Sequence, residues 1–165
     1  MRRELRALGL AVALAGGVAL AAPAEAQSAT GGVSVRILQA ITVTKTFDLN
    51  FGRVVAGTTS GTVAIAEDGT RTCAAALRCL GGTSAGAFAV TGTAGEVVTV
   101  SVDTPSITLT NGAGATMAVT LASTTRTLTL TGGNGSFRVS GTLTVGARQT
   151  GGDYTGQFTV SVNYQ

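Results

Sequence analysis

Short stretches with a strict period of two constrain the fold of this chain more than any other feature of its sequence. In residues 151–165 the apolar and aromatic side chains stand at even positions, with polar residues between them: Tyr154, Phe158, Val160, Val162 and Tyr164. Alternation of this kind places such side chains on one face of a β-strand. We therefore expect a core strand here, following the turn residues Gly151 and Gly152.

The same alternation recurs along the chain, separated by glycine-rich turns. Strand-like patterns occupy residues 62–66, 88–91, 96–102, 107–110, 117–121, 127–131 and 137–145. The segment 111–114, with the sequence Asn-Gly-Ala-Gly, is a hairpin signal between two of them. About nine short strands without a convincing helix predict an all-β protein, built as a sandwich or a barrel.

The longest alternating run, residues 33–51, exceeds the usual length of one strand. We expect two segments, with the break near residues 39–40 or at Lys45. The first piece, residues 33–38, follows Gly31 and Gly32 and carries Val33, Val35 and Ile37 on one face. It is either an ordinary first strand or a mobile extension.

Residues 1–26 have the three segments of a secretory signal peptide: an arginine-rich start, an apolar run at residues 7–22, and the small-residue pattern Ala24-Glu25-Ala26. A membrane anchor is the alternative, but the apolar run is shorter than the ~20 residues that a span needs. The sequence thus predicts export and a mature chain of residues 27–165 without a membrane span.

Cys73 and Cys79 are the only cysteines of the chain. An exported protein meets an oxidising compartment, in which a disulfide is the default state of such a pair. A metal or redox site is the alternative, but the chain has no histidine to complete a ligand set. We predict that Cys73 and Cys79 form a disulfide.

The sequence gives little indication of a catalytic site. There is no histidine for acid–base catalysis, and the carboxylates are scattered at turns and strand ends. The glycine-rich segments lack the lysine and hydroxyl ending of a phosphate-binding loop. Three of the eleven basic residues lie in the leader, so the sequence predicts no nucleic-acid partner. We expect a protein that is not an enzyme and has no cofactor or metal site.

Three motifs carry a resemblance to a known family: residues 48–52 (Asp-Leu-Asn-Phe-Gly), residues 141–145 (Gly-Thr-Leu-Thr-Val) and the closing alternation of glycines, aromatics and valines. They resemble an uncharacterised family of exported bacterial proteins that is similar to the spore-coat-protein-U group and to pilin subunits of chaperone–usher systems. Gly152 and Tyr164 stand where pilins commonly carry a glycine and an aromatic residue. Residues 29–37 resemble the N-terminal extension of archaic pilins. The cysteines depart from the pattern, because many pilins pair cysteines across distant strands.

The resemblance implies an immunoglobulin-like β-sandwich at residues 39–165 that lacks its final strand. Residues 27–38 would then be an extension that donates Val33, Val35 and Ile37 to a neighbouring copy. The C-terminal strand, with Gly152, Tyr154, Phe158, Val160, Val162 and Tyr164, would line the acceptor groove. A periplasmic chaperone and an outer-membrane usher would be further partners, and the assembled fibre would lie at the cell surface.

Two alternatives stay open at the level of the sequence. The first is a self-contained secreted coat or matrix domain that pairs residues 33–38 with its own sheet. The second is a small outer-membrane β-barrel, although aromatic residues make up only 4% of the chain. That share is low for two aromatic girdles, and the strands are short against the ~9–11 residues of a membrane-spanning strand.

Overall fold

The computed structural model describes residues 27–165, so the predicted signal peptide lies outside the described residues. Arg36–Gln165 form one compact unit, and residues 27–35 form a separate one. Residues 27–41 contain no strand, whereas the compact unit contains strands and no helix. In the described part of the chain, no helix has the length and apolar character needed to cross a membrane.

Twelve strands make up the compact unit, which confirms the prediction of an all-β fold. In chain order they are β1 (Thr42–Phe47), β2 (Arg53–Val55), β3 (Gly61–Ile65), β4 (Arg71–Cys73), β5 (Arg78–Leu80), β6 (Gly86–Thr91), β7 (Val97–Val102), β8 (Ser106–Thr110), β9 (Thr116–Ala122), β10 (Thr127–Thr129), β11 (Asn134–Val145) and β12 (Val160–Tyr164).

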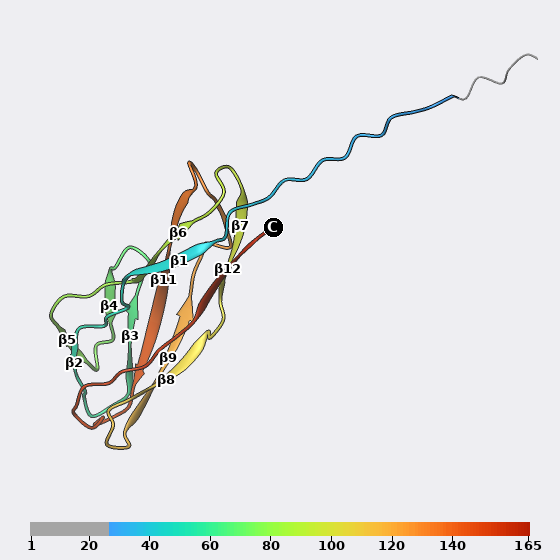
Figure 1. Cartoon of the computed structure of the whole chain (residues 1–165). Helices are drawn as coiled ribbons and strands as arrows, with labels where there is room; N and C mark the ends of the chain where they lie inside the picture. The colour runs from blue at the N-terminus through green and yellow to red at the C-terminus, as the bar shows by residue number, and fades with distance from the viewer. Residues whose placement is uncertain (1–26) are drawn as a thin grey trace, which may run out of the picture. The chain divides into compact units, whose positions relative to one another are not determined.

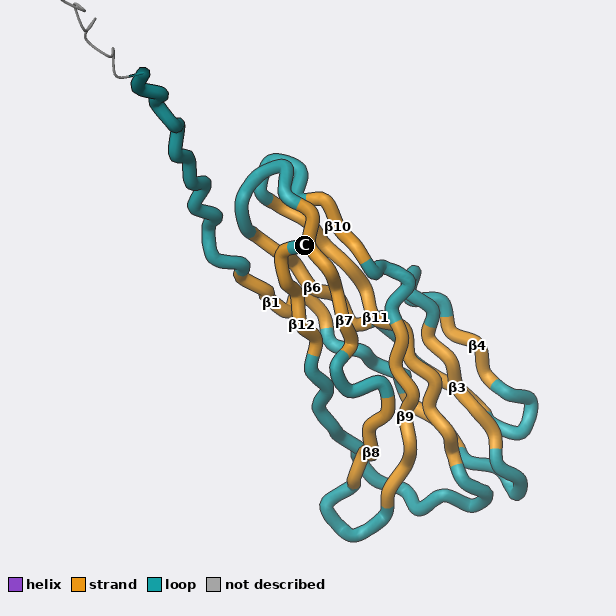
Figure 2. The backbone as a smooth tube through the Cα atoms, turned by 90° about the vertical axis from the view of Figure 1, so that its right-hand side faces the viewer, coloured by secondary structure: helices purple, strands orange, loops and turns teal. Residues whose placement is uncertain are grey.

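The strands form two main antiparallel sheets and a short ribbon (Figures 1 and 2). The larger sheet follows the order β1-β6-β11-β3-β4, and β9 joins β11 to β8. The smaller sheet has the order β10-β7-β12, and β2 pairs with β5 alone. The twelve-residue β11 is the spine of the larger sheet, because its first half pairs with β6 and its second half pairs with both β3 and β9.

The two main sheets enclose a single apolar core, which makes the fold a β-sandwich. The smaller sheet and its flank contribute Val98, Val100, Leu130 and Val162 to the core cluster, and the larger sheet contributes Val90, Phe137 and Val139 among others. Phe88 and Phe137 stack with their ring centroids 5.2 Å apart. Full burial of such side chains stabilises a fold by about 1.5–3 kcal/mol each, so this cluster is the main source of stability.

The predicted hairpin is confirmed. β8 and β9 pair in register, with Leu109 opposite Met117 and Ile107 opposite Val119. The Asn111 side-chain oxygen accepts hydrogen bonds from the backbone N–H groups of Ala113 and Ala115. Gly112, with φ of 73°, adopts the left-handed conformation that favours glycine in such turns.

Two strands differ from the sequence-based expectation. β12 covers only Val160–Tyr164, and the preceding residues 151–159 are irregular apart from a bridge between Thr155 and Thr110. Gly156 lies so close to β8 that a Cβ there would be 2.7 Å from the Leu109 side chain, so this approach requires glycine. In β1 the register shifts between Lys45 and Phe47, so Phe47 is turned outward and is 62% exposed.

Candidate functional site

The smaller sheet covers only part of the inner face of the larger one. Over β8, β9 and the second half of β11, two largely irregular segments lie where longer strands would complete the second layer: residues 48–56, which contain the three-residue β2, and residues 149–158. Between these segments is a cavity of about 850 Å³. We call this cavity the groove. Its floor consists of Ile107, Leu109, Met117, Val119, Leu143 and Val145.

The floor of the groove is apolar because three strands turn their alternating side chains to the same face. Ile107 faces Val119 and Leu109 faces Met117 across the β8–β9 pair, and Leu143 of β11 faces Val119 in the next pair. Val119 and Leu143 are buried, whereas Ile107, Leu109 and Met117 are only half-buried. The outer part of the floor is therefore apolar surface that the described chain leaves accessible.

The first wall, residues 48–56, is held to the larger sheet in two ways. Leu49 and Phe51 pack over Gly141 of β11, where an added Cβ would lie 2.6 Å and 3.2 Å from their side chains. The disulfide between Cys73 and Cys79, predicted from the sequence, is present. It joins β4, which pairs with β3, to β5, which pairs with β2 in the wall. The disulfide is thus a covalent tie between the larger sheet and this wall.

The second wall, residues 149–158, is held by polar contacts and by one aromatic ring. The Tyr154 hydroxyl donates to the carbonyl of Thr150 at 2.7 Å and accepts from the Gln149 amide at 2.9 Å. The same amide donates to the carbonyl of Thr116 in β9. Phe158 packs edge-on against Phe88, with ring centroids 5.9 Å apart. These contacts fix the segment at the rim and leave the floor beside it open.

Two strands with an unpaired edge connect to the rim of the groove, because β1 leads into Asp48 and β12 follows Phe158. β1 and β12 lie side by side in Figures 1 and 2, and each pairs on only one side, with β6 and β7 respectively. Asp103 donates its backbone N–H to the carbonyl of Thr159, and Gln165 donates to the carbonyl of Val97. Because hydrogen-bonded pairs alternate in an antiparallel ladder, the N–H and C=O groups of Val160, Val162 and Tyr164 point away from β7, toward the unpaired edge.

The C-terminal residues predicted from the sequence lie in three different places relative to the groove. Gly152, Tyr154 and Phe158 line the groove. Val160 and Val162 lie in β12 and pack on the core, and Val162 is buried. Tyr164 lies at the far end of β12, where its hydroxyl bonds to Gln39 and Thr93. The contact of these residues with an incoming strand stays a prediction.

The extension residues Val33, Val35 and Ile37 have side chains that are 100%, 86% and 88% exposed. They are the most exposed large apolar side chains of the described chain. Sequence reasoning identified them, but it missed the groove residues Leu49, Phe51, Ile107, Leu109 and Met117. Their alternation was visible, yet it gave no sign that the second sheet would leave them uncovered.

The chemistry of the site is apolar, with backbone donors and acceptors at one edge. Its charged lining residues are Asp48, Arg53 and Asp153, and Asp48 is paired with Lys45 at 2.6 Å. An unpaired edge beside an apolar groove suits an extended peptide, because the backbone of the peptide can add to the sheet while alternate side chains enter the groove.

The fold and the site define a class: an antiparallel β-sandwich with an incomplete second layer and unpaired edges next to an apolar groove. Residues 41–164 match the family described as the domain of unknown function DUF4402, and the chain belongs to that family. No curated protein and no solved structure matches the chain.

Proposed function

We propose that this protein is a structural subunit of a surface fibre, and that copies join by strand donation. Residues 33–37 of one copy would enter the groove of the next and complete its second layer. The observation that carries this proposal is the groove itself, a cavity of about 850 Å³ over an apolar floor, at the end of β12 and in line with its free edge. The arrangement is that of a binding surface for an extended segment, and we infer a structural rather than a catalytic role.

The extension has the dimensions and the pattern of an occupant. Five extended residues span about 17 Å, which is the length of β12, also five residues. Val33, Val35 and Ile37 alternate with Ser34 and Arg36, so one face would meet the floor while the other meets solvent. Leaving three such side chains in water is unfavourable by about 1.5–3 kcal/mol each relative to full burial.

The resemblance of the sequence to pilin and spore-coat-U proteins supports the rest of the proposal. On that basis the signal peptide directs export to the periplasm, where a chaperone fills the groove until an outer-membrane usher passes the subunit to the fibre at the cell surface. A secreted coat or matrix domain that completes its own sheet is the competing function. It differs in one property: its groove would not accept a strand from outside.

The test uses the exported chain and its Val35→Asp variant. The aspartate would place an unpaired charge in the groove, so Val35→Asp should abolish oligomers while leaving the thermal melt of the monomer unchanged. Ser34→Asp adds the same charge to the solvent-facing side of the extension and is the matched control. Size-exclusion chromatography with light scattering measures the oligomers. Normal assembly of Val35→Asp, or assembly lost equally in both variants, contradicts the proposal.

A second arm tests the groove directly. A peptide of residues 31–38 is added to the Val35→Asp chain, and the shift in melting temperature reports binding to the folded state. Leu109→Ser in the floor should weaken the peptide effect, whereas Thr108→Ser, on the opposite and exposed face of β8, should not. A melt that is high and independent of peptide would identify a domain that completes its own sheet.

A further inference from the structure

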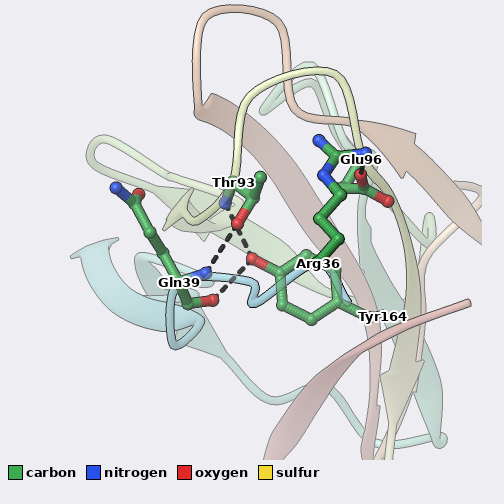
Figure 3. Close-up of polar contacts among 5 residues, drawn as sticks. All are labelled: Arg36, Gln39, Thr93, Glu96 and Tyr164. Carbon is green, nitrogen blue, oxygen red and sulfur yellow. Dashed lines mark hydrogen bonds and ion pairs between the residues drawn. The ribbon is translucent and has the colours of Figure 1, made fainter. Parts of the chain in front are cut away.

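The residues that lead from the extension into β1 are tied to the end of the sandwich by a small polar cluster (Figure 3). The Tyr164 hydroxyl donates to the carbonyl of Gln39 and accepts from the backbone N–H of Thr93, both at 2.7 Å. Gln39 also donates its backbone N–H to the Thr93 hydroxyl at 2.7 Å, and Arg36 pairs with Glu96 at 2.6 Å. We call these five residues the latch.

The latch gives a side-chain partner to both backbone polar groups of Gln39. The hydroxyl of Tyr164 occupies a space that only a glycine at position 92 provides, because a Cβ there would lie 2.5 Å from that oxygen. Ile41 and Val43 pack on the core just beyond this point. The chain at Gln39 is therefore held from two sides, by hydrogen bonds and by packing.

The register of the smaller sheet shows in which direction the latch holds the chain. Tyr164 faces Val98 and Gln165 bonds to Val97, so Glu96 lies beyond the end of β12. Arg36 pairs with Glu96, which means that the chain from Gln39 back to Arg36 runs off the end of the sandwich. The groove begins at the other end of β12, next to Phe158.

Without the latch, the extension of one copy could compete for the free edge of its own β12 and for the end of the groove next to Phe158. A reversal at Gln39 would lay the preceding residues along the free edge between β1 and β12. At ~3.3 Å per residue, Val35 would reach the level of Val160 and Val33 would reach that of Phe158. An intramolecular strand has the advantage of a high effective concentration, so it would outcompete the strand of a second copy.

We propose that the latch holds the base of the extension away from the groove of its own subunit and thereby reserves that groove for the extension of a second copy. The proposal rests on the proposed function, and it names the partner as another copy of this chain. Tyr164 acts here as a positioning residue: its hydroxyl never contacts the incoming strand, but it decides which copy supplies that strand.

The experiment compares the exported chain with two variants that release the latch, Tyr164→Phe and Glu96→Arg. Tyr164→Phe keeps the ring and its packing and removes only the hydroxyl. Each variant should raise the ratio of monomer to oligomer at fixed concentration by roughly two- to tenfold, the range that one hydrogen bond or ion pair implies. In the monomer fraction of each variant, amide exchange at residues 33–37 should slow, because these residues now pair along the edge of their own β12.

The rescue variant is Arg36→Glu combined with Glu96→Arg, which restores the ion pair with reversed signs. It should return the monomer-to-oligomer ratio toward that of the unmodified chain. A purely structural role of Tyr164 predicts a different result: lower stability, with residues 33–37 still exchanging freely in the monomer. That result, or an unchanged ratio in both variants, overturns the proposal.

The peptide of residues 31–38 separates this proposal from the proposed function. If the Val35→Asp chain binds the peptide and the unmodified chain forms oligomers, but the latch variants behave like the unmodified chain, only the latch proposal fails. If the unmodified chain neither binds the peptide nor forms oligomers, strand donation fails and the latch proposal is overturned with it.

Discussion

The two halves of the sandwich differ in how their second layer is built. Where β7, β10 and β12 lie over β6 and the first half of β11, the core is closed, and Val90, Val98, Leu130 and Val139 have no exposed surface. Over β8, β9 and the second half of β11, two largely irregular segments and the short β2 take the place of a second sheet, and Ile107, Leu109 and Met117 stay half-buried. We call these the closed half and the open half.

The comparison teaches that apolar burial is distributed unevenly over the two halves of one sandwich. The closed half has paired strands in both layers and carries the stacked pair of Phe88 and Phe137, so its core is covered from both sides. The open half keeps an apolar floor, held between a disulfide-tied wall and a wall pinned by Tyr154. If a second copy donates its extension as proposed, the bound strand would bury the apolar surface that the floor leaves accessible.

The largest effect is expected from a truncation in the closed half. Phe137→Ala removes a ring that is 3% exposed and stacks on Phe88, and it should lower the free energy of unfolding by about 3–5 kcal/mol. Met117→Ala in the open half removes a half-buried side chain and should cost only about 1 kcal/mol. Urea unfolding of both variants measures the difference. Equal costs would mean that the two halves are equally well packed.

The disulfide should have an intermediate effect, concentrated in the open half. Replacing Cys73 and Cys79 together by serine opens a short loop and should lower stability by about 2 kcal/mol. Because β5 pairs only with β2, the wall at residues 48–56 should lose protection first. Amide exchange should therefore quicken in β2 and β5 while β6 and β7 keep their rates. A uniform increase over all strands would contradict a local role for the disulfide.

The smallest expected effect is on the acid dependence of stability. It comes from the turn between β3 and β4, outside both halves. The pKa of Asp68 is lowered from its ordinary value of 3.8, because the backbone N–H of Thr70 and then the Thr70 side chain donate hydrogen bonds to the carboxylate. Because the pKa of Asp68 is lowered in the folded state, its ionised carboxylate stabilises the fold at pH values above the ordinary pKa. This stabilisation is lost as the pH falls through the pKa of the folded state. Asp68→Asn should flatten this part of the acid dependence.

Urea unfolding at a series of pH values from about 6 to about 2 measures that dependence. Thr70→Ala is the matched variant, because it removes the side-chain bond and keeps the backbone bond, so it should flatten the profile only in part. An Asp68→Asn profile that coincides with that of the unmodified chain would assign the acid dependence to other groups.

Much of the fold follows from the sequence because alternation is a local property. Val98 and Val100, the hairpin at Asn111 and the disulfide between Cys73 and Cys79 were all predictable from spacing, turn chemistry and compartment. The exposed triplet of Val33, Val35 and Ile37 stood out for the same reason. The three-residue strands β2, β4 and β5 were missed, since three residues carry too little periodicity to detect.

Only the tertiary structure decided which apolar strand faces are packed against a second layer. The period of two assigns Leu109 and Val98 to inward faces with equal force, yet one lies on the open floor of the groove and the other is completely buried. Likewise, Tyr154 and Tyr164 belong to one alternating series, but the first pins a groove wall and the second closes the latch on Gln39. The physical reason is that alternation specifies which side chains share a face of a strand. Whether a second layer packs on that face depends on strand pairing between residues far apart in the chain.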